Sequence, residues 1–466
     1  MLLCYIKVRV KMLIVMSDLH LAEAGSNALE DVKFDNNLPA SVYRVYFNEI
    51  ADYIHKNHIA KVDLILAGDV FEITRSALWL ENGLRPYVHL NEIAEGSPME
   101  ARIAAILATI AREERVSETL NLFRNLENIL QRPINVHFLP GNHDRLANAT
   151  PLVRHQVQSL LGLPLNDAPF QNQFIAYSQG EPFVLVRHGH EYDPSNFGLN
   201  VKELESIPTF IPAEVYGRPV LGDITTLELA AKLPKLFREY YTEETILQRP
   251  ELRMIYRRLM DFDNVRPAGA LMNFLLTTPG LHQSETWHYV EPIFLRAMND
   301  IAENPELSKT ILTLGGLAGV SSRTLALLLR QSTWRHGIPF WLVKRTSAGL
   351  SHKIKLSSIV DQIEKEECLQ PGLSTIQCIV CGHTHNPEVE LLQVQDGQHK
   401  YYLNSGTFRN VIAATPEMDK FSRLRSKARI LIFEPGEQNP EYTRETGWSF
   451  DFTAKFAYGS EPELTE

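Results

Sequence analysis

Five short apolar segments of this chain each end in a turn rich in Asp, Asn or His. Continuous apolar runs of this length are typical of strands buried on both faces of a sheet. The expected strands cover Met12–Met16, Val62–Ala67, Asn135–Leu139, Phe183–Val186 and Ile376–Cys381. The turns that follow them are Asp18-Leu19-His20, Gly68-Asp69, Gly141-Asn142-His143-Asp144, His188-Gly189-His190 and Gly382-His383-Thr384-His385.

Helical spacing separates the early strands, over Tyr43–Asn57 and Met99–Arg132, the latter as one or two helices. Further strands are expected at Tyr401–Leu403 and Ala428–Phe433. Strands that alternate with helices favour an α/β fold. Open α/β sheets bind their ligands beyond the carboxyl ends of the strands, where all five polar turns are expected.

The first and last of these turns have the same donor spacing. Residues two apart in extended chain point to the same side, so Asp18 and His20 can bind one ion together. His383 and His385 repeat this arrangement after another strand. One such pair alone is more often a cap or a turn than a metal site, and only the conjunction of five turns predicts a metal centre.

The remaining turns supply further oxygen and nitrogen donors. Asp69 offers a carboxylate that can bridge two cations, Asn142 an amide oxygen and His188 an imidazole. This donor set without thiolate favours Mn²⁺, our first choice, or Fe²⁺, Fe³⁺, Co²⁺ or Zn²⁺ over Ca²⁺ or Cu⁺. Two such ions ~3.5–4 Å apart would lower the pKa of a bridging water, and the hydroxide would attack a phosphate ester in line. We expect His143 to protonate the leaving oxygen and Asp144 to orient the His143 ring.

Composition narrows the class of protein. The 466 residues allow one large core with a big insertion, and the net charge of -10 does not indicate nucleic acid as a partner. Cys378 and Cys381 have the spacing of a zinc knuckle, but we interpret them as strand residues because no second pair exists. No apolar run reaches the ~18 residues of a membrane span. Lys7, Arg9 and Lys11 interrupt the apolar start, so we expect a soluble, cytoplasmic protein. Oligomeric state is left open.

Helical spacing dominates residues 200–370, which contain none of the five turns. We therefore divide the chain into a core at 1–199, a helical insertion at 200–370, a second core part at 371–435 and a C-terminal tail at 436–466. The basic residues of the insertion are the solvated face of packed helices or a lid over an anionic substrate. The expected helices cover Leu227–Tyr241, Glu243–Phe262, Ala268–Leu275, Tyr289–Glu303, Leu307–Leu314 and Ser321–Gln331.

The five motifs in this order resemble the calcineurin-like metallophosphoesterase superfamily. The resemblance implies an α/β/β/α sandwich of two mixed sheets, and it implies His143 as the residue that serves the leaving group. It also implies a division of the metal ligands. One metal would be bound by Asp18, His20 and His385, the other by Asn142, His188 and His383, with Asp69 bridging the two.

Within the superfamily, the chain resembles two branches in particular. Gly68-Asp69-Val70-Phe71-Glu72 resembles the form in UDP-2,3-diacylglucosamine pyrophosphatases, although those enzymes usually have an arginine in place of His143 and are much shorter. The first and third turns also resemble repair exonucleases of the Mre-eleven type. We predict a binuclear phosphoesterase that cleaves a phosphodiester or pyrophosphate bond. The alternatives are a phosphomonoesterase or phosphoprotein phosphatase, a DNA exonuclease or endonuclease, and a non-catalytic scaffold.

Overall fold

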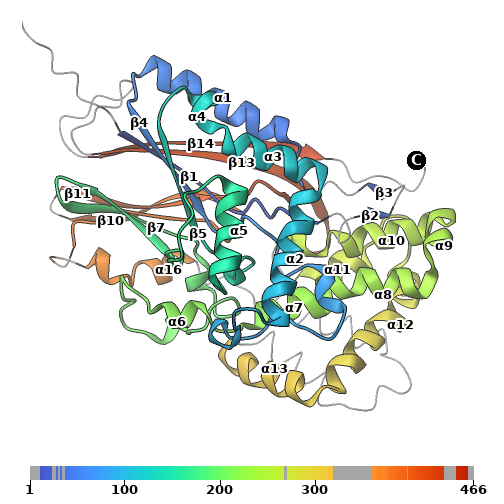
Figure 1. The fold of residues 1–466 in the computed structure, drawn as a ribbon. Coiled ribbons are helices and arrows are strands. Elements are labelled where there is room, and N and C mark those ends of the chain that lie inside the picture. Colours follow the sequence, from blue (N-terminus) through green and yellow to red (C-terminus); the bar gives the residue numbers. More distant parts are fainter. Residues whose placement is uncertain are drawn as a thin grey trace, which may run out of the picture.

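Two mixed β-sheets face each other in the computed structural model, with helices on both outer faces (Figure 1). The structure describes residues 11–23, 28–29, 32–33, 37–266, 270–318, 359–370, 372, 374–395, 397–434 and 448–459. This layering is the α/β/β/α sandwich that the family resemblance implied, and it confirms the predicted fold class.

The larger sheet has seven strands in the order β5-β4-β1-β13-β12-β8, with β14 also paired to β13. The three strands that carry the first three polar turns, β1, β4 and β5, are parallel neighbours, so their carboxyl ends meet at one edge. A separate two-stranded sheet joins β2 and β3. The strands are β1 Lys11–Met16, β2 Ala28–Leu29, β3 Val32–Lys33, β4 Lys61–Ala67, β5 Ile134–Leu139, β8 Val265–Arg266, β12 Asn410–Ala414, β13 Phe421–Phe433 and β14 Ser449–Gly459.

The smaller sheet has five strands in the order β10-β11-β9-β7-β6. The central strands β7 and β9 are parallel, and they carry the fourth and fifth polar turns. Cys378 and Cys381 are buried within β9, which confirms their interpretation as strand residues. The strands are β6 Gln173–Ser178, β7 Glu181–Arg187, β9 Cys378–Cys381, β10 Pro387–Gln395 and β11 Gln398–Ser405.

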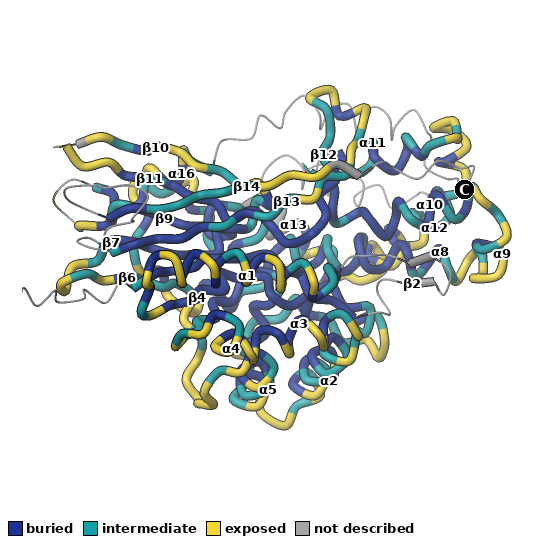
Figure 2. The backbone as a smooth tube through the Cα atoms, turned by 90° about the horizontal axis from the view of Figure 1, so that it is seen from above, coloured by how far each residue is buried: buried dark blue, intermediate teal, exposed yellow. Residues whose placement is uncertain are grey.

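The unbroken apolar runs are explained by burial on both faces. In β1, Leu13 and Val15 pack between the two sheets, against residues such as Val184 and Ile430. The intervening residues, such as Ile14, pack under the helices. Since successive side chains of a strand point to opposite faces, both faces must be apolar. Figure 2 shows β7 and β9 as buried and the outer turns of α4 and α5 as exposed.

Helices cover the outer faces of both sheets. Residues of α1, α2, α3 and α5 share one apolar core with β1 and β4, on the outside of the larger sheet. The predicted helical stretch 99–132 is three helices, because the backbone is extended at Glu113 and leaves helical geometry again at Asn125. The short α6 and α16 pack on the smaller sheet. These helices are α1 Ala40–Lys56, α2 Pro98–Arg112, α3 Glu114–Arg124, α4 Leu126–Leu130, α5 Pro151–Leu161, α6 Ala213–Tyr216 and α16 Ile359–Ile363.

The helices between α6 and α16 lie beyond one end of the sheets (Figure 1). One apolar core is shared by η7 and α8 to α12, and a second one by α7, α13 and the end of α12. The expected helix Glu243–Phe262 is broken at Pro250, the first residue of α10, because proline suits the first turn of a helix but not its interior. The expected helix Ser321–Gln331 lies outside the described residues. This group contains α7 Leu221–Thr225, the π-helix η7 Thr226–Ala231, α8 Lys232–Tyr241, α9 Glu243–Gln248, α10 Pro250–Met260, α11 Leu271–Leu276, α12 Gln283–Ala302 and α13 Pro305–Ala318.

Among the described strands, β2, β3, β6, β8, β10, β12 and β14 were not expected from the sequence. Two of them, β8 and β14, lie in stretches that were expected to contain no strand. β8 belongs to the mostly helical stretch 200–370, yet it pairs with β12 in the larger sheet. β14 belongs to the expected tail 436–466, yet its eleven residues pair with β13. Among the described residues, no helix is both long and apolar enough for a bilayer span. The 3₁₀ helices are η2 Ala77–Leu80, η3 Leu90–Glu92, η4 Arg145–Asn148, η5 His190–Tyr192, η6 Val201–Glu203, η8 Phe262–Asn264 and η11 Glu367–Leu369.

Candidate metal centre

The polar turns of the two sheets converge into one buried cluster. Its side chains form three overlapping groups in which the potential ligand atoms all lie within 4.8 Å of one another. Asp69 belongs to two of the groups, as a bridging carboxylate should. The groups are Asp18, His20 and His385; His20, Asp69 and His143; and Asp69, His188 and His383.

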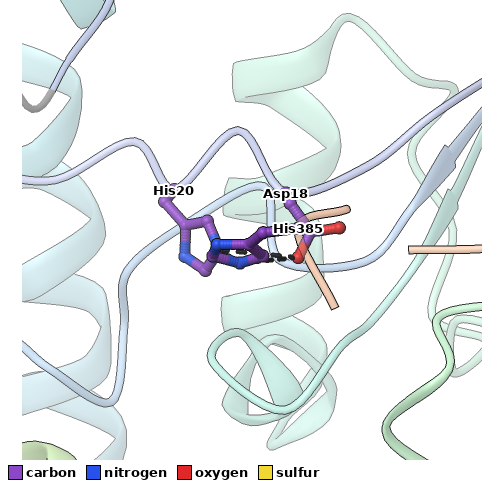
Figure 3. A group of neighbouring side chains, drawn as sticks. All are labelled: Asp18, His20 and His385. Carbon is purple, nitrogen blue, oxygen red and sulfur yellow. Dashed lines mark hydrogen bonds and ion pairs between the residues drawn. The ribbon is translucent and has the colours of Figure 1, made fainter. Parts of the chain in front are cut away.

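The first group brings three donor atoms face to face (Figure 3). Asp18 Oδ1 lies 3.2 Å from His385 Nε2 and 3.5 Å from His20 Nε2. The two imidazole Nε2 atoms are 3.0 Å apart. His20 Nδ1 donates to a Glu72 carboxylate oxygen, so the neutral His20 ring directs the lone pair of Nε2 at the other two residues. Lone pairs that face each other this closely repel unless a cation or proton lies between them.

The group of Asp69, His188 and His383 has the same character. His188 Nδ1 donates to the Ala67 carbonyl at 2.8 Å, which leaves the Nε2 lone pair of a neutral ring 3.0 Å from Asp69 Oδ2. His383 Nε2 donates to Asp193 Oδ2 at 3.2 Å, so its Nδ1 is the atom left to bind an ion. Asn142 comes from the turn after β5, and its side-chain nitrogen lies 3.4 Å from Asn196 Oδ1.

Unsatisfied buried atoms mark where ions fit. Within the part of the chain that the structure describes, Asp18 Oδ1, Asn142 Oδ1 and His188 Nε2 are buried without a hydrogen-bond partner. Buried polar atoms are normally paired, and each unpaired one costs about 1–3 kcal/mol. The three atoms are an acid oxygen, an amide oxygen and an imidazole nitrogen, which are ligand types that transition metals accept. The residues present therefore fit a pair of such ions.

Electrostatics also favour added positive charge. Burial lowers the pKa of His188, but the Asp69 and Asp18 carboxylates outweigh it and raise the pKa to about 10. Burial likewise opposes charging of His143, and Glu72 and Asp69 raise its pKa to about 10. Burial would raise the pKa of Asp18, yet His188 and other histidines hold it well below its usual range. The buried carboxylates thus attract cations.

The backbone is strained at the ligand positions. Asp18, His20, Asp69, His383 and His385 all have φ between +49° and +65°, a region that non-glycine residues adopt only rarely. Each such residue costs of order 1–3 kcal/mol and persists only where its surroundings enforce it. This backbone geometry turns the side chains of short loops inward. It differs from the extended backbone that the sequence analysis assumed for residues two apart.

Two glycines let the loops approach. A Cβ atom at Gly382 would overlap with Ser17 Oγ and Asp18 Oδ2, and one at Gly141 would overlap with Asp69 Oδ1. Glycine at these positions brings the turn after β9 against the turn after β1, and the turn after β5 against Asp69. The two sheets therefore meet at the centre with no room for a larger residue.

Glu72 is a site residue to which sequence reasoning gave no role. It is fully buried, and its Oε1 accepts from His20 Nδ1 and, at 2.9 Å, from Arg409 Nη1. Its Oε2 accepts from His143 Nδ1 at 3.1 Å. One carboxylate thus orients two histidines of the centre. The sequence signal was an acidic residue three positions after Asp69 in Gly68-Asp69-Val70-Phe71-Glu72.

The expected contact of Asp144 with the His143 ring is wrong. The two oxygens of Asp144 accept from the backbone N–H groups of Gly141, Val70 and Phe71 at 2.6, 2.7 and 3.2 Å. Asp144 therefore joins the turns after β4 and β5. A carboxylate close to backbone donors is satisfied locally, and the Glu72 oxygen from the neighbouring loop is the one that reaches the His143 ring.

Residues next to the ligands have mainly supporting contacts. His190 is buried, and its ring packs edge-on against Phe197 and Tyr216. Arg145 donates through Nε and Nη2 to Asp223 Oδ2 at 3.0 and 2.8 Å, in agreement with a salt-bridge role. Asp193 accepts from the Ser195 backbone N–H at 2.9 Å, as expected of a turn, in addition to its contact with His383.

Comparison with known proteins agrees with this geometry. The sequence profile of the calcineurin-like phosphoesterases matches residues 12–223, which include the first four polar turns and exclude His383 and His385. A search of curated proteins found no match. A dimetal phosphatase from Danio rerio aligns with 91% of this chain and 95% of its own, at 11% identity and a TM-score of 0.27, which is too low to carry an argument. Over residues 12–223, the chain is therefore similar to the calcineurin-like phosphoesterases.

Proposed function

We propose that the protein is a binuclear metal-dependent hydrolase of phosphodiester or pyrophosphate bonds. The observation that carries this proposal is the position of Asp69. It lies in one group with His188 and His383, and in another with His20, which also belongs to the group of Asp18 and His385. A structural site for one ion would need one closed group of ligands. Two groups that share a carboxylate fit two ions side by side, which is the arrangement of enzymes that clamp both oxygens of an in-line displacement.

We assign Asp18, His20 and His385 to one ion, Asn142, His188 and His383 to the other, and Asp69 to both. When bound, such ions supply Lewis-acid activation of a water and neutralise charge on the phosphate. Glu72 holds His20 through Nδ1, and Asp193 holds His383 through Nε2, so each ring has a fixed tautomer. We assign Mn²⁺ as the first candidate, with Fe, Zn and Co as alternatives.

His143 has the geometry of a proton donor to the leaving group. Its backbone N–H donates to Asp69 Oδ1 at 2.8 Å, which places the ring beside the bridging carboxylate. Its Nδ1 donates to Glu72 at 3.1 Å, and although burial lowers the pKa of the ring, Glu72 and Asp69 outweigh it and raise that pKa. The side chain is 13% exposed. In this assignment His143 holds a proton at Nε2 and delivers it to the departing oxygen.

The test compares His143→Asn with the parent protein on two phosphodiesters. We expect both the parent and His143→Asn to bind two metal ions, measured by elemental analysis after dialysis. Turnover of a diester with an alkyl alcohol leaving group should fall by ~10²–10⁴-fold in His143→Asn. Turnover of bis-p-nitrophenyl phosphate should fall less, because nitrophenolate leaves without a proton. His137→Asn, a change on the neighbouring strand β5, is the matched control.

Several outcomes would contradict the proposal. Equal loss on both diesters would remove the leaving-group role of His143. A parent protein that binds no transition metal stoichiometrically would favour the scaffold alternative. A parent that hydrolyses only monoesters, or only DNA, would favour the phosphomonoesterase or the nuclease. A panel of monoesters, diesters, nucleotide-sugars and DNA, assayed with Mn²⁺, therefore separates the four functions.

We also propose that residues 200–370 form a cap on a core made of 1–199 and 371–435, followed by the tail 436–466. The separate apolar core of α8, α10 and α12 supports a distinct unit. Its strand β8 pairs with β12 and so attaches the unit to the larger sheet, beside the metal centre. We propose a cytoplasmic location, which the three described cysteines support because all are unpaired and buried.

A further inference from the structure

Three arginines, Arg75, Arg266 and Arg409, lie on one side of the candidate metal centre, and we call them the arginine cluster. Arg266 Nη2 lies 3.1 Å from His385 Nδ1 and 3.4 Å from His385 Nε2. These similar distances place the guanidinium over the face of the ring, so the in-plane lone pairs stay available for an ion. Arg75 and Arg409 share one acid, Asp263 Oδ2, at 3.5 and 3.2 Å.

Two of these arginines have unused donors. Arg75 and Arg409 are each only 2% exposed. Arg75 Nη2 donates to the Met260 carbonyl at 3.4 Å, and Arg409 Nη1 donates to Glu72 at 2.9 Å. Among the described residues, Nε and Nη1 of Arg75 and Nε and Nη2 of Arg409 have no hydrogen-bond partner. Buried guanidinium donors of this kind are costly unless an anion pairs with them.

The local charge does not balance. Glu72 is in contact with His20 and His143 as well as with Arg409. Glu72 and Asp263 are thus the two acids that face Arg75 and Arg409, and Glu72 is shared with the two histidines. Burial and the neighbouring Arg75 lower the pKa of Arg409, as expected where cations outnumber acids. An added dianion would pair with the unused donors, and guanidinium groups match phosphate oxygens in geometry.

The position of the arginine cluster relative to His143 indicates which part of the substrate this anion belongs to. Glu72 contacts both Arg409 and His143, so the cluster lies beside the proposed proton donor. Asp263 is 16% exposed and His143 is 13% exposed, so both are partly accessible to solvent. The substrate group that departs next to His143 would therefore meet the arginines. Arg266 and Asp263 come from the 200–370 stretch, so that stretch contributes to the choice of substrate.

We propose that the arginine cluster binds a phosphoryl group on the leaving side of the substrate, so that the bond cleaved joins two phosphoryl groups. This inference rests on the proposed hydrolase function and narrows it to pyrophosphate linkages. Water adds to one phosphorus, the bridging P–O bond breaks, and the bridging oxygen leaves with the second phosphoryl group. The products are two phosphate monoesters, and the two protons of the water are carried on them or released.

The first experiment compares two substrates of the metal-loaded protein. ADP-ribose has a phosphoryl leaving group, and bis-p-nitrophenyl phosphate has an aryl one without charge. For Arg75→Gln, the ratio of kcat/KM for ADP-ribose to that for bis-p-nitrophenyl phosphate should fall about 10- to 100-fold, the scale of one hydrogen bond to a charged group. Arg102→Gln, on α2 with an exposed partner at Glu81, should keep the parent ratio.

The second experiment needs no turnover. Inorganic phosphate is titrated into the metal-free protein by calorimetry, and Arg75→Gln should bind it about 10-fold or more weakly than the parent and Arg102→Gln. Should circular dichroism show that Arg75→Gln does not fold, Arg266→Gln replaces it, because Arg266 is partly exposed.

The proposal is overturned if the variant keeps the parent substrate ratio or binds phosphate as tightly as the parent. If the parent hydrolyses neither substrate but its phosphate binding depends on Arg75, the hydrolase function fails and the anion site stands.

Discussion

Glu72→Gln tests whether one buried carboxylate organises the metal centre. The change keeps the volume of the side chain but leaves one acceptor oxygen where there were two. Glu72 Oε1 accepts from His20 and Arg409, and Oε2 accepts from His143, so an amide can keep the contacts of one oxygen only. The amide nitrogen then faces a ring N–H or a guanidinium. Either His20 or His143 loses its orienting partner.

The magnitude follows from the contacts. A hydrogen bond to a charged group contributes about 1.5–3 kcal/mol, so loss of one and weakening of another should lower the unfolding free energy of the metal-free protein by about 2–4 kcal/mol. Loss of the group that orients a metal ligand typically costs about 10–100-fold in metal affinity. We expect this second loss for the ion at Asp18, His20 and His385, and a smaller one for the other ion.

Equilibrium dialysis against graded Mn²⁺, followed by elemental analysis, measures both binding steps. Glu100→Gln is the matched control. Glu100 is a buried glutamate on α2, away from the metal centre, and it accepts from the Gly96 backbone N–H. Urea unfolding of the metal-free variants measures the stability change. If Glu72→Gln bound both ions within about twofold of the parent, the reasoning that Glu72 orients His20 would be refuted, since outer-shell losses are normally larger.

Three further variants test other contacts. Asp69→Asn should lose both metal ions together, because its carboxylate belongs to two ligand groups, and retention of two tightly held ions in elemental analysis would contradict the bridging assignment. Gly382→Ala should lose about 1–3 kcal/mol in urea unfolding, and should bind metal more weakly, because its Cβ would overlap with Asp18; unchanged stability would show that the loop can move away. Burial would raise the pKa of Asp63, but hydrogen bonds from His137, Lys11 and other donors hold it well below 3.8, so Asp63 stabilises the fold above that pH and this contribution is lost as pH falls. Asp63→Asn should therefore cost about 1–2 kcal/mol at pH 6 and progressively less in acid, and a loss that does not depend on pH would contradict the ion-pair explanation.

Local sequence was enough to predict the strands that carry ligands. β1, β4, β7 and β9 are apolar on both faces, so their burial leaves a continuous signal in the chain. The strands that sequence reasoning missed have weaker patterns. β14 includes Asp451 and Lys455 among its residues, and β8 has only two residues. Such strands form because a neighbour offers hydrogen bonds, and that neighbour is far away in sequence.

The sequence by itself determined the α/β fold class and the candidate donor residues, because both depend on residue type and short-range spacing. Only the tertiary structure decided which donors meet. It pairs Glu72 rather than Asp144 with His143, brings Arg266 from the 200–370 stretch to His385, and leaves Arg75 with unused donors. These contacts join loops up to hundreds of residues apart, and their geometry depends on how two sheets pack, which no local pattern encodes.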